Sequence, residues 1–295
     1  MDSIKKKIAI IGGDNREKKL TGLLAQKGYQ VNVLADEPFL EHERITYYTT
    51  VKSAIKGTDV VIAPVSGVDD RGFLKSSFVQ KQVRLDENFF ELFSTGTLFM
   101  IGVVNDYLKK YLMSKDIKHV ELGSRDDFAI LNAIPTAEGA IKIAIEETPF
   151  TLYDSNILVL GLGRVGKTLA WRLKLLGAEV YAATRSKKAI ARGKDLGFNM
   201  IGYRNLSLLL PRMNIIFNTV PALVLNEELI KHVSSETLII DLASSPGGTD
   251  FEAAKKRNIT ALLALGLPGK VAPESAGKIL GEIVLAIIEK PAEYL

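Results

Sequence analysis

Short apolar runs alternate with amphipathic segments from one end of the chain to the other, and this alternation predicts parallel α/β sheets. In the first half, segment 15–27 has the apolar spacing of a helix, whereas segment 67–87 is polar and irregular and is expected to form loops. Some of the first-half runs are almost wholly apolar, as strands buried on both faces of a sheet should be. The five strands expected there are 7–11, 31–34, 60–65, 98–104 and 119–122.

A second series of the same kind begins after Pro149, and two apolar helices flank it. Pro135 is expected to break the chain before the first helix, with Thr136 as its N-cap. The second helix follows Pro273 and carries a broad apolar stripe. The strands expected between the two helices are 156–160, 179–183, 214–220, 237–242 and 259–265.

These elements predict an α/β fold of two Rossmann-like or flavodoxin-like parallel-sheet domains, with a cleft between them and crossing helices that join them. The N-terminal, substrate-side domain is expected over residues 1–135, completed by the C-terminal helix at 273–290. A linking helix at 136–148 leads to the nucleotide-binding domain at 149–271. A length of 295 residues agrees with two domains of ordinary size.

Charge and composition argue against several classes of protein. The 38 basic and 34 acidic residues leave a net charge of +4 without long blocks of like charge, so no nucleic-acid partner is expected. The chain lacks a run of about 18 uninterrupted apolar residues, and its start lacks a signal-peptide pattern, so no membrane association is expected. With no cysteine and three histidines, it is not expected to bind a metal. We expect a cytoplasmic protein, with homo-oligomerisation left open.

The sharpest motif is the glycine loop GLGRVG, which follows an apolar strand and opens a helix. This order is typical of a dinucleotide-binding site. Gly161 would allow the tight turn, Gly163 the close approach of a pyrophosphate, and Gly166 the close packing of helix on strand. The helix begins with Arg164 and Val165, and its N-terminus would present unpaired N–H groups to the phosphates while Arg164 adds a cation. The alternative is a glycine turn that serves packing alone.

The end of the next strand indicates which nicotinamide nucleotide binds. NAD sites usually carry an acid there for the ribose hydroxyl, but here Thr184, Arg185 and Ser186 follow the strand and no acid occurs before Asp195. Hydroxyls and cations suit a 2′-phosphate, so NADP is favoured over NAD, the alternative being a basic turn without a ligand. The end of the 214–220 strand is expected to line the nicotinamide side, at Thr219, Val220 and Pro221.

Five blocks together resemble the A-subunit family of dipicolinate synthase: IGGDNREKKL, GSRDDFAILNAIPTAEGAI, VLGLGRVGKTLA, DLASSPGGTDF and LGLPGKVAPESAGKIL. The resemblance covers nearly the whole chain. It implies oxidation of dihydrodipicolinate to dipicolinate with NADP, in the mother cell of a sporulating bacterium. It also implies a flavoprotein-like B subunit of the same enzyme as partner.

A dicarboxylate substrate requires donors, and several residues are candidates. The turn at Gly13 precedes a helix, and Arg16 and Arg125 could each form a two-pronged contact with a carboxylate, although both could equally be surface ion pairs. A turn follows a buried strand at the edge where α/β sheets bind ligands, and it contains Ser244, Gly247 and Gly248.

Removal of one hydride from the dihydro ring must be accompanied by loss of one proton, for which a modest base suffices because the product is aromatic. The acid candidates are Asp126, Asp127 and Glu138, of which Asp127 and Glu138 are taken as the site residues. Glu138 is expected in the first turn of the 136–147 helix, where an acid could equally serve only to complement the helix dipole.

Two rival functions remain. A D-2-hydroxyacid dehydrogenase would pair an acid with a histidine shortly after the last strands of the cofactor domain, but residues 265–276 contain no histidine and His232 lies earlier in a helical segment. A nucleotide-binding component of a complex, without catalysis of its own, is the second rival, since obvious acid–base residues are scarce.

Overall fold

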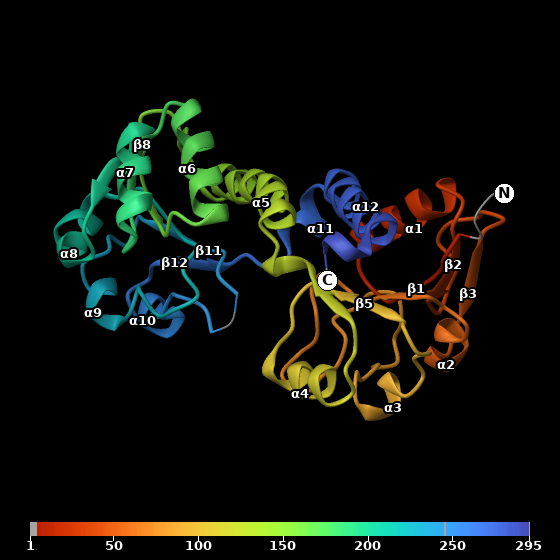
Figure 1. Cartoon of the computed structure of the whole chain (residues 1–295). Helices are drawn as coiled ribbons and strands as arrows, with labels where there is room; N and C mark the ends of the chain where they lie inside the picture. Colours follow the sequence, from red (N-terminus) through yellow and green to blue (C-terminus); the bar gives the residue numbers. More distant parts are fainter. Residues whose placement is uncertain (1–4, 245, 295) are drawn as a thin grey trace. The chain divides into compact units, whose positions relative to one another are not determined.

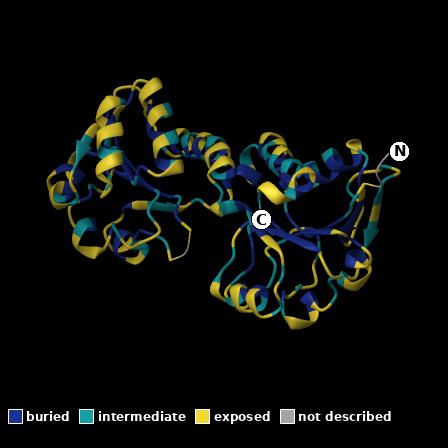
Figure 2. Cartoon of the chain, in the orientation of Figure 1, coloured by how far each residue is buried: buried dark blue, intermediate teal, exposed yellow. Residues whose placement is uncertain are grey.

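The computed structural model describes residues 5–244 and 246–294. It divides the chain into two compact units, Met1–Leu131 with Pro268–Leu295 and Asn132–Leu267, here called the first and the second unit. Each unit is built on a six-stranded, wholly parallel sheet, and Figure 2 shows the strands largely buried beneath more exposed helices. The fold class predicted from the sequence, two Rossmann-like α/β domains, is confirmed.

The sheet of the first unit has the order β3-β2-β1-β4-β5-β6. Helices α1 and α12 cover one face, and α2, α3 and α4 cover the other (Figure 1). The strands are β1 Lys7–Ile11, β2 Gln30–Leu34, β3 Ile45–Tyr48, β4 Val60–Ile62, β5 Leu98–Ile101 and β6 His119–Glu121; the helices are α1 Asn15–Gln26, α2 Val51–Ile55, α3 Glu87–Phe90, α4 Asp106–Ser114, α11 Leu267–Val271 and α12 Pro273–Glu289.

The sheet of the second unit has the order β12-β11-β10-β7-β8-β9. Strands β8 and β9 are added on one side of β7, and β10, β11 and β12 on the other side, so the strand order reverses between the neighbours β7 and β10. The strands are β7 Asn156–Leu160, β8 Glu179–Ala183, β9 Asn199–Ile201, β10 Ile215–Asn218, β11 Leu238–Asp241 and β12 Thr260–Leu263; the helices are α6 Arg164–Leu175, α7 Lys187–Asp195, α8 Leu206–Leu209, α9 Glu227–Ile230 and α10 Phe251–Lys256. Helix α5, Asp126–Glu147, begins in the first unit and ends in the second.

The C-terminal helix α12 packs on α1 in the first unit. A Cβ at Gly277 would lie 2.4 Å from the Cβ of Lys19, so the two backbones approach more closely than larger residues would allow. The apolar stripe of α12 is buried beside Leu20 and Leu24 of α1, through Leu280, Val284, Ile287 and Ile288.

The expected break at Pro135 is wrong, because α5 continues through this proline. Thr136 is not an N-cap: its hydroxyl donates to the Asn132 carbonyl one turn earlier. A proline inside a helix removes one backbone hydrogen bond. Here the residues buried before and after Pro135 in the chain stabilise the helix in spite of that loss. The buried residues are Ala133, Ala137, Ala140 and Ala144.

Helix α5 is also, within the described part of the chain, a helix long and apolar enough to cross a membrane by length and composition alone. Its most apolar 18-residue window has a mean hydropathy of 1.4, and 39% of that window is buried.

Candidate functional site

The glycine loop of the second unit joins β7 to α6 in a tight turn. Gly161 has a φ of +88°, which favours glycine, and a Cβ there would lie 2.5 Å from the hydroxyl oxygen of Thr219. A Cβ at Gly166 would lie 2.0 Å from the carbonyl oxygen of Gly161. The Thr219 hydroxyl donates to the Leu160 carbonyl at 2.9 Å and so ties the end of β10 to the loop. The first and third glycines therefore permit the close packing of strand, loop and helix.

The middle glycine differs from its neighbours. Gly163 is the N-cap residue of α6, and no described atom lies within 4 Å of the position that a Cβ would take. Gly163 has no side chain that could cap this 12-residue helix, in contrast to Asp14 at α1. Open space beside Gly163 at the N-terminus of a helix fits the pyrophosphate of a nicotinamide dinucleotide. Arg164 is exposed and Val165 is half-buried in the same turn.

The chain after β8 is basic and exposed. The Thr184 hydroxyl oxygen accepts the N–H of Ser186 at 3.3 Å, and the Ser186 hydroxyl caps α7 by accepting the N–H of Ala189. Arg185 forms no ion pair among the residues that the structure describes. Burial raises the pKa of the Tyr203 hydroxyl, and the positive charge of Arg185 opposes that rise, which places Arg185 near Tyr203. The end of β8 therefore offers hydroxyls and a cation to an anion.

A buried pair of polar side chains holds the neighbouring strand ends. Asn218 and Asp241 end β10 and β11, lie side by side in the sheet register, and are fully buried. The Asn218 amide donates to the Asp241 carboxylate at 2.9 Å and to the Val220 carbonyl at 3.1 Å. The Asp241 carboxylate also accepts the N–H groups of Ala243 and Gly248, at 2.9 and 3.0 Å. This network fixes the segment that starts at Thr219.

Asp241 was not among the residues predicted from the sequence. The signal was present, because a polar residue ends each of two neighbouring strands that are otherwise apolar, IIFN and LIID.

The turn after β11 is anchored by this network. A Cβ at Gly248 would lie 2.1 Å from the Asn218 amide nitrogen, and Gly247 has a φ of +84°, so both positions suit glycine. The N–H of Gly247 donates to the Ser244 carbonyl, and the Ser244 side chain is exposed. Ser245 lies outside the described residues. The structure thus brings Gly248 of this turn beside Val220, at the carboxyl ends of the strands.

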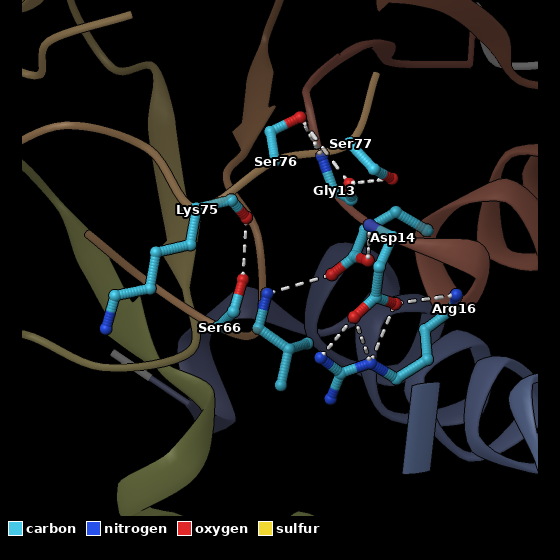
Figure 3. A network of polar contacts seen from close by, with 9 residues as sticks. Gly13, Asp14, Arg16, Ser66, Lys75, Ser76 and Ser77 are labelled. Carbon is cyan, nitrogen blue, oxygen red and sulfur yellow. Dashed lines mark hydrogen bonds and ion pairs between the residues drawn. The ribbon is translucent and has the colours of Figure 1, made fainter. Parts of the chain in front are cut away.

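In the corresponding turn of the first unit, side chains of the same unit accept the N–H groups (Figure 3). The N–H of Gly13 donates to the Ser76 hydroxyl at 3.0 Å, and the N–H of Asp14 donates to the Glu17 carboxylate at 2.8 Å. Asp14 caps α1 by accepting the N–H of Arg16, within a capping box completed by Glu17. This geometry does not favour the expectation that the turn at Gly13 binds a substrate carboxylate, because side chains of the protein already accept these N–H groups.

Arg16, expected to clamp a carboxylate, is only 4% exposed and is already paired. Its Nε and Nη2 donate to the two oxygens of Asp14, at 3.0 and 2.7 Å. The positive charge of the Arg16 guanidinium is therefore neutralised by the Asp14 carboxylate in the same turn.

Glu17 is a buried acid that was not predicted from the sequence as a site residue. One carboxylate oxygen accepts the N–H of Asp14 and the other accepts the N–H of Val65, each at 2.8 Å. Glu17 is 1% exposed, and its burial raises the pKa of the carboxyl to about 7, against the opposing effect of the Arg16 charge. The Asp-x-x-Glu spacing from Asp14 is that of a capping box and could have indicated this partner.

Arg125 and Asp127, expected to bind a carboxylate and to remove a proton, are paired with each other. The Arg125 guanidinium donates to both Asp127 oxygens, at 3.1 and 2.6 Å, and stacks 4.4 Å from the centre of the Tyr294 ring. Hydrogen bonding from Arg125 lowers the pKa of Asp127. A carboxylate with a lowered pKa is a weaker proton acceptor, so this geometry does not favour Asp127 as a base.

Glu138 is not in the first turn of a helix but in the middle of α5, since the helix begins at Asp126. Its carboxylate lies 3.8 Å from the Nε of Arg172 and is largely exposed. Arg172 is eight residues beyond the start of α6, about 12 Å along the helix axis from the glycine loop. The expected role of Glu138 in proton removal at the cofactor is therefore not supported by its position.

No group of three or more acids or histidines suited to a metal occurs in the part of the chain that the structure describes.

Comparisons with known proteins agree with this division of the chain. Residues 7–123 match the N-terminal domain of the dipicolinate synthase A subunit, and residues 137–244 match the NAD binding domain of D-isomer specific 2-hydroxyacid dehydrogenases. The D-lactate dehydrogenase of Escherichia coli superposes with a TM-score of 0.63 at 18% identity, over 97% of each chain, which shows a shared fold. Fold, glycine loop and domain match together define an oxidoreductase that uses a nicotinamide nucleotide.

More similar relatives narrow this class. The chain is 36% identical to the dipicolinate synthase A subunit of Bacillus subtilis (strain 168), over 96% of this chain and 95% of that protein. The structure of the dipicolinate synthase A subunit from Bacillus halodurans superposes with a TM-score of 0.88 at 35% identity, over 96% of this chain and 97% of that one. The chain belongs to the A-subunit family of dipicolinate synthase.

Proposed function

We propose that this chain oxidises dihydrodipicolinate to dipicolinate with NADP. The substrate class follows from the name of the relatives, and the observation that carries the cofactor assignment is the uncapped N-terminus of α6 at Gly163. The dihydro ring loses one hydride and one proton and becomes an aromatic pyridine. When bound, NADP accepts the hydride.

Different segments of the second unit bind different parts of the dinucleotide. The α6 N-terminus and Arg164 bind the pyrophosphate, and Thr184, Arg185 and Ser186 bind the 2′-phosphate. The segment Thr219–Pro221, held by Asn218 and Asp241, positions the nicotinamide.

The substrate's carboxylates need donors that are not already neutralised. The N–H of Gly13 and the Arg16 guanidinium already form hydrogen bonds within the first unit. Arg125 could bind a substrate carboxylate only after its ion pair with Asp127 breaks. In the turn with Ser244, Gly247 and Gly248 the two glycine N–H groups are engaged as well, so we take the exposed Ser244 side chain, at this carboxyl edge of the sheet, as the leading candidate for one carboxylate.

The biological setting is also part of the proposal. The relatives are named as one lettered component of dipicolinate synthase, which implies a second component, and we take this partner to be the flavoprotein-like B subunit. The reaction would take place in the cytoplasm of the mother cell during sporulation.

The function is tested by turnover of dihydrodipicolinate with NADP, for the chain alone and with the B subunit. The wild type is expected to form dipicolinate and reduced cofactor in equal amounts. Gly163→Ala should retain the fold, because a Cβ there meets no described atom, but should weaken NADP binding by about tenfold to hundredfold, because the Cβ takes the space of the pyrophosphate. Turnover and calorimetric binding measure the two effects.

Gly202→Ala is the matched control, because a Cβ at Gly202 also meets no atom of the described chain within 4 Å and its φ of −80° suits alanine. Equal NADP affinity of Gly163→Ala and Gly202→Ala would show that the pyrophosphate does not bind at this loop. Absence of dipicolinate with and without the B subunit would refute the reaction.

Arg185→Ala tests the choice of NADP over NAD. Loss of an exposed contact to the 2′-phosphate should weaken NADP binding by about tenfold and leave NAD binding nearly unchanged. Arg192→Ala, at an exposed arginine further along α7 that pairs with Asp195, should affect neither cofactor. Tighter binding of NAD than of NADP to the wild type would count against the assignment.

A further inference from the structure

The end of strand β9 lies beside the segment that we expect to bind the 2′-phosphate. Strands β8 and β9 are parallel neighbours in the sheet, with Ala183 opposite Ile201, so the chain leaves both strands at the same edge. Segment 184–186 follows β8, and a short 3₁₀ helix, Tyr203–Asn205, follows β9. Side chains after β9 are therefore placed to act on the same ligand as those after β8.

Tyr203 combines a packed ring with a hydroxyl that has no partner. The side chain is half-buried against the apolar cluster that contains Leu206 and Leu209 of α8. Its hydroxyl forms no hydrogen bond within the described part of the chain. The positive charge of Arg185 acts on this hydroxyl, because it opposes the rise that burial causes in the pKa of Tyr203. The Tyr203 hydroxyl therefore lies near Arg185 and keeps its hydrogen at neutral pH, so it is available as a donor.

The ends of β8 and β9 carry cations without acids beside them in the sequence. Between Glu179 and Glu227 the chain contains a single acid, Asp195, which pairs with Arg192 in the last turn of α7. Unpaired cations gathered in this way favour an anionic ligand. The cations that are exposed here and form no ion pair with any described residue are Arg185, Lys187, Lys188 and Arg204.

The charge of a 2′-phosphate requires more than one cation. A phosphate monoester carries a charge of about −1.5 to −2 at pH 7 and has three acceptor oxygens. Arg185 supplies one positive charge, and the hydroxyls of Thr184 and Ser186, which accept backbone N–H groups, still have hydrogens to donate. A second guanidinium would neutralise the remaining charge and bind two oxygens at once, which a lysine does not do. Arg204 is the arginine at the neighbouring strand end.

We propose that Tyr203 and Arg204 complete the 2′-phosphate site and decide, together with Arg185, the choice of NADP over NAD. The Tyr203 hydroxyl donates to one phosphate oxygen, and the Arg204 guanidinium neutralises the second charge of the phosphate. NAD has a neutral ribose hydroxyl at this position and gains little from either side chain. This inference rests on the proposed binding of NADP to the second unit.

Two adenine nucleotides without a nicotinamide isolate this recognition from turnover. Adenosine 2′,5′-bisphosphate carries the 2′-phosphate and adenosine 5′-monophosphate lacks it, so the ratio of their affinities, measured by calorimetry, reports the phosphate contact alone. The wild type is expected to bind the bisphosphate about a hundredfold more tightly. Tyr203→Phe, which keeps the ring, should lower this ratio by about fivefold, and Arg204→Ala by about tenfold. Affinity for the 5′-monophosphate should not change.

Tyr181→Phe and Arg212→Ala are the matched controls. Tyr181 is half-buried against the same apolar cluster but lies earlier in β8. Arg212 is exposed, has no ion pair in the described part of the chain, and precedes β10, at the opposite edge of the sheet. Both controls should keep the wild-type ratio, and thermal unfolding checks that all four variants are folded.

The outcomes separate this inference from the proposed function. A wild-type ratio in Tyr203→Phe or in Arg204→Ala would overturn the role of that residue. If Arg185→Ala lowered the ratio and neither of these variants did, the inference would be wrong while the preference for NADP would stand. Equal binding of the two nucleotides by the wild type would refute both.

Discussion

Asp241→Ala is expected to lower the free energy of unfolding of the second unit by about 3–5 kcal/mol. The substitution would leave three buried donors without their acceptor: the N–H groups of Ala243 and Gly248 and the side-chain amide of Asn218. Each unpaired buried group costs about 1–3 kcal/mol. Trp171, the sole tryptophan of the chain, lies in this unit, so its fluorescence during urea unfolding measures the effect.

Asp250→Ala provides the comparison for Asp241→Ala. Asp250 accepts one N–H, that of Ala253, as the N-cap of α10, and its loss should cost about 1 kcal/mol, as ordinary N-caps do. Asp241→Asn keeps one acceptor oxygen, so its loss of unfolding free energy should lie between those of Asp241→Ala and Asp250→Ala. If Asp241→Ala were no more destabilising than Asp250→Ala, the buried network would not hold these strand ends together.

Glu17 is expected to make the stability of the first unit fall as the pH rises from about 4.5 to about 7. Its pKa is raised from the ordinary 4.5 to about 7 in the folded protein, so between these values the folded state binds a proton that the unfolded state has lost. The stabilisation is complete below pH 4.5 and is lost as the pH passes the folded pKa. The difference corresponds to about 3 kcal/mol.

Glu17→Gln should remove this dependence, because glutamine does not titrate. Relative to the wild type, the variant should gain about 3 kcal/mol between pH 5 and pH 8, whatever its lost hydrogen bond costs at both values. Urea unfolding followed by circular dichroism at the two pH values measures the change. Glu236→Gln, at an exposed turn residue, is the control, and a Glu17→Gln variant that keeps the wild-type pH dependence would contradict the assignment.

The two glycine turns show how one backbone pattern yields different sites. Each follows the first strand of a parallel sheet and opens a 12-residue helix. Asp14 and Glu17 close the N-terminus of α1, whereas Gly163 leaves the N-terminus of α6 uncapped. An anion would meet negative side chains at the first turn and N–H groups at the second.

The interior strands were predictable because both of their faces are buried, which requires continuous apolar runs such as those of β1, β5 and β7. The edge strands β3 and β9 were missed, because each has one neighbour, is partly exposed, and lacks such a run. Pro135 led to the prediction of a break that does not occur. Proline does disfavour the interior of a helix, but burial of the alanines around Pro135 stabilises α5.

The sequence by itself determined the features that depend on neighbouring residues: the two α/β series, the glycine loop, and the acid-free segment of Thr184, Arg185 and Ser186 after β8. Only the tertiary structure decided which polar groups are already satisfied. Arg16 and Arg125 are paired, Glu138 lies beside α6 rather than at the glycine loop, and Asp241 joins the end of β10 to the turn that follows β11. The physical reason is that burial and hydrogen-bond partners arise from contacts made during folding, many of them between residues far apart in the chain.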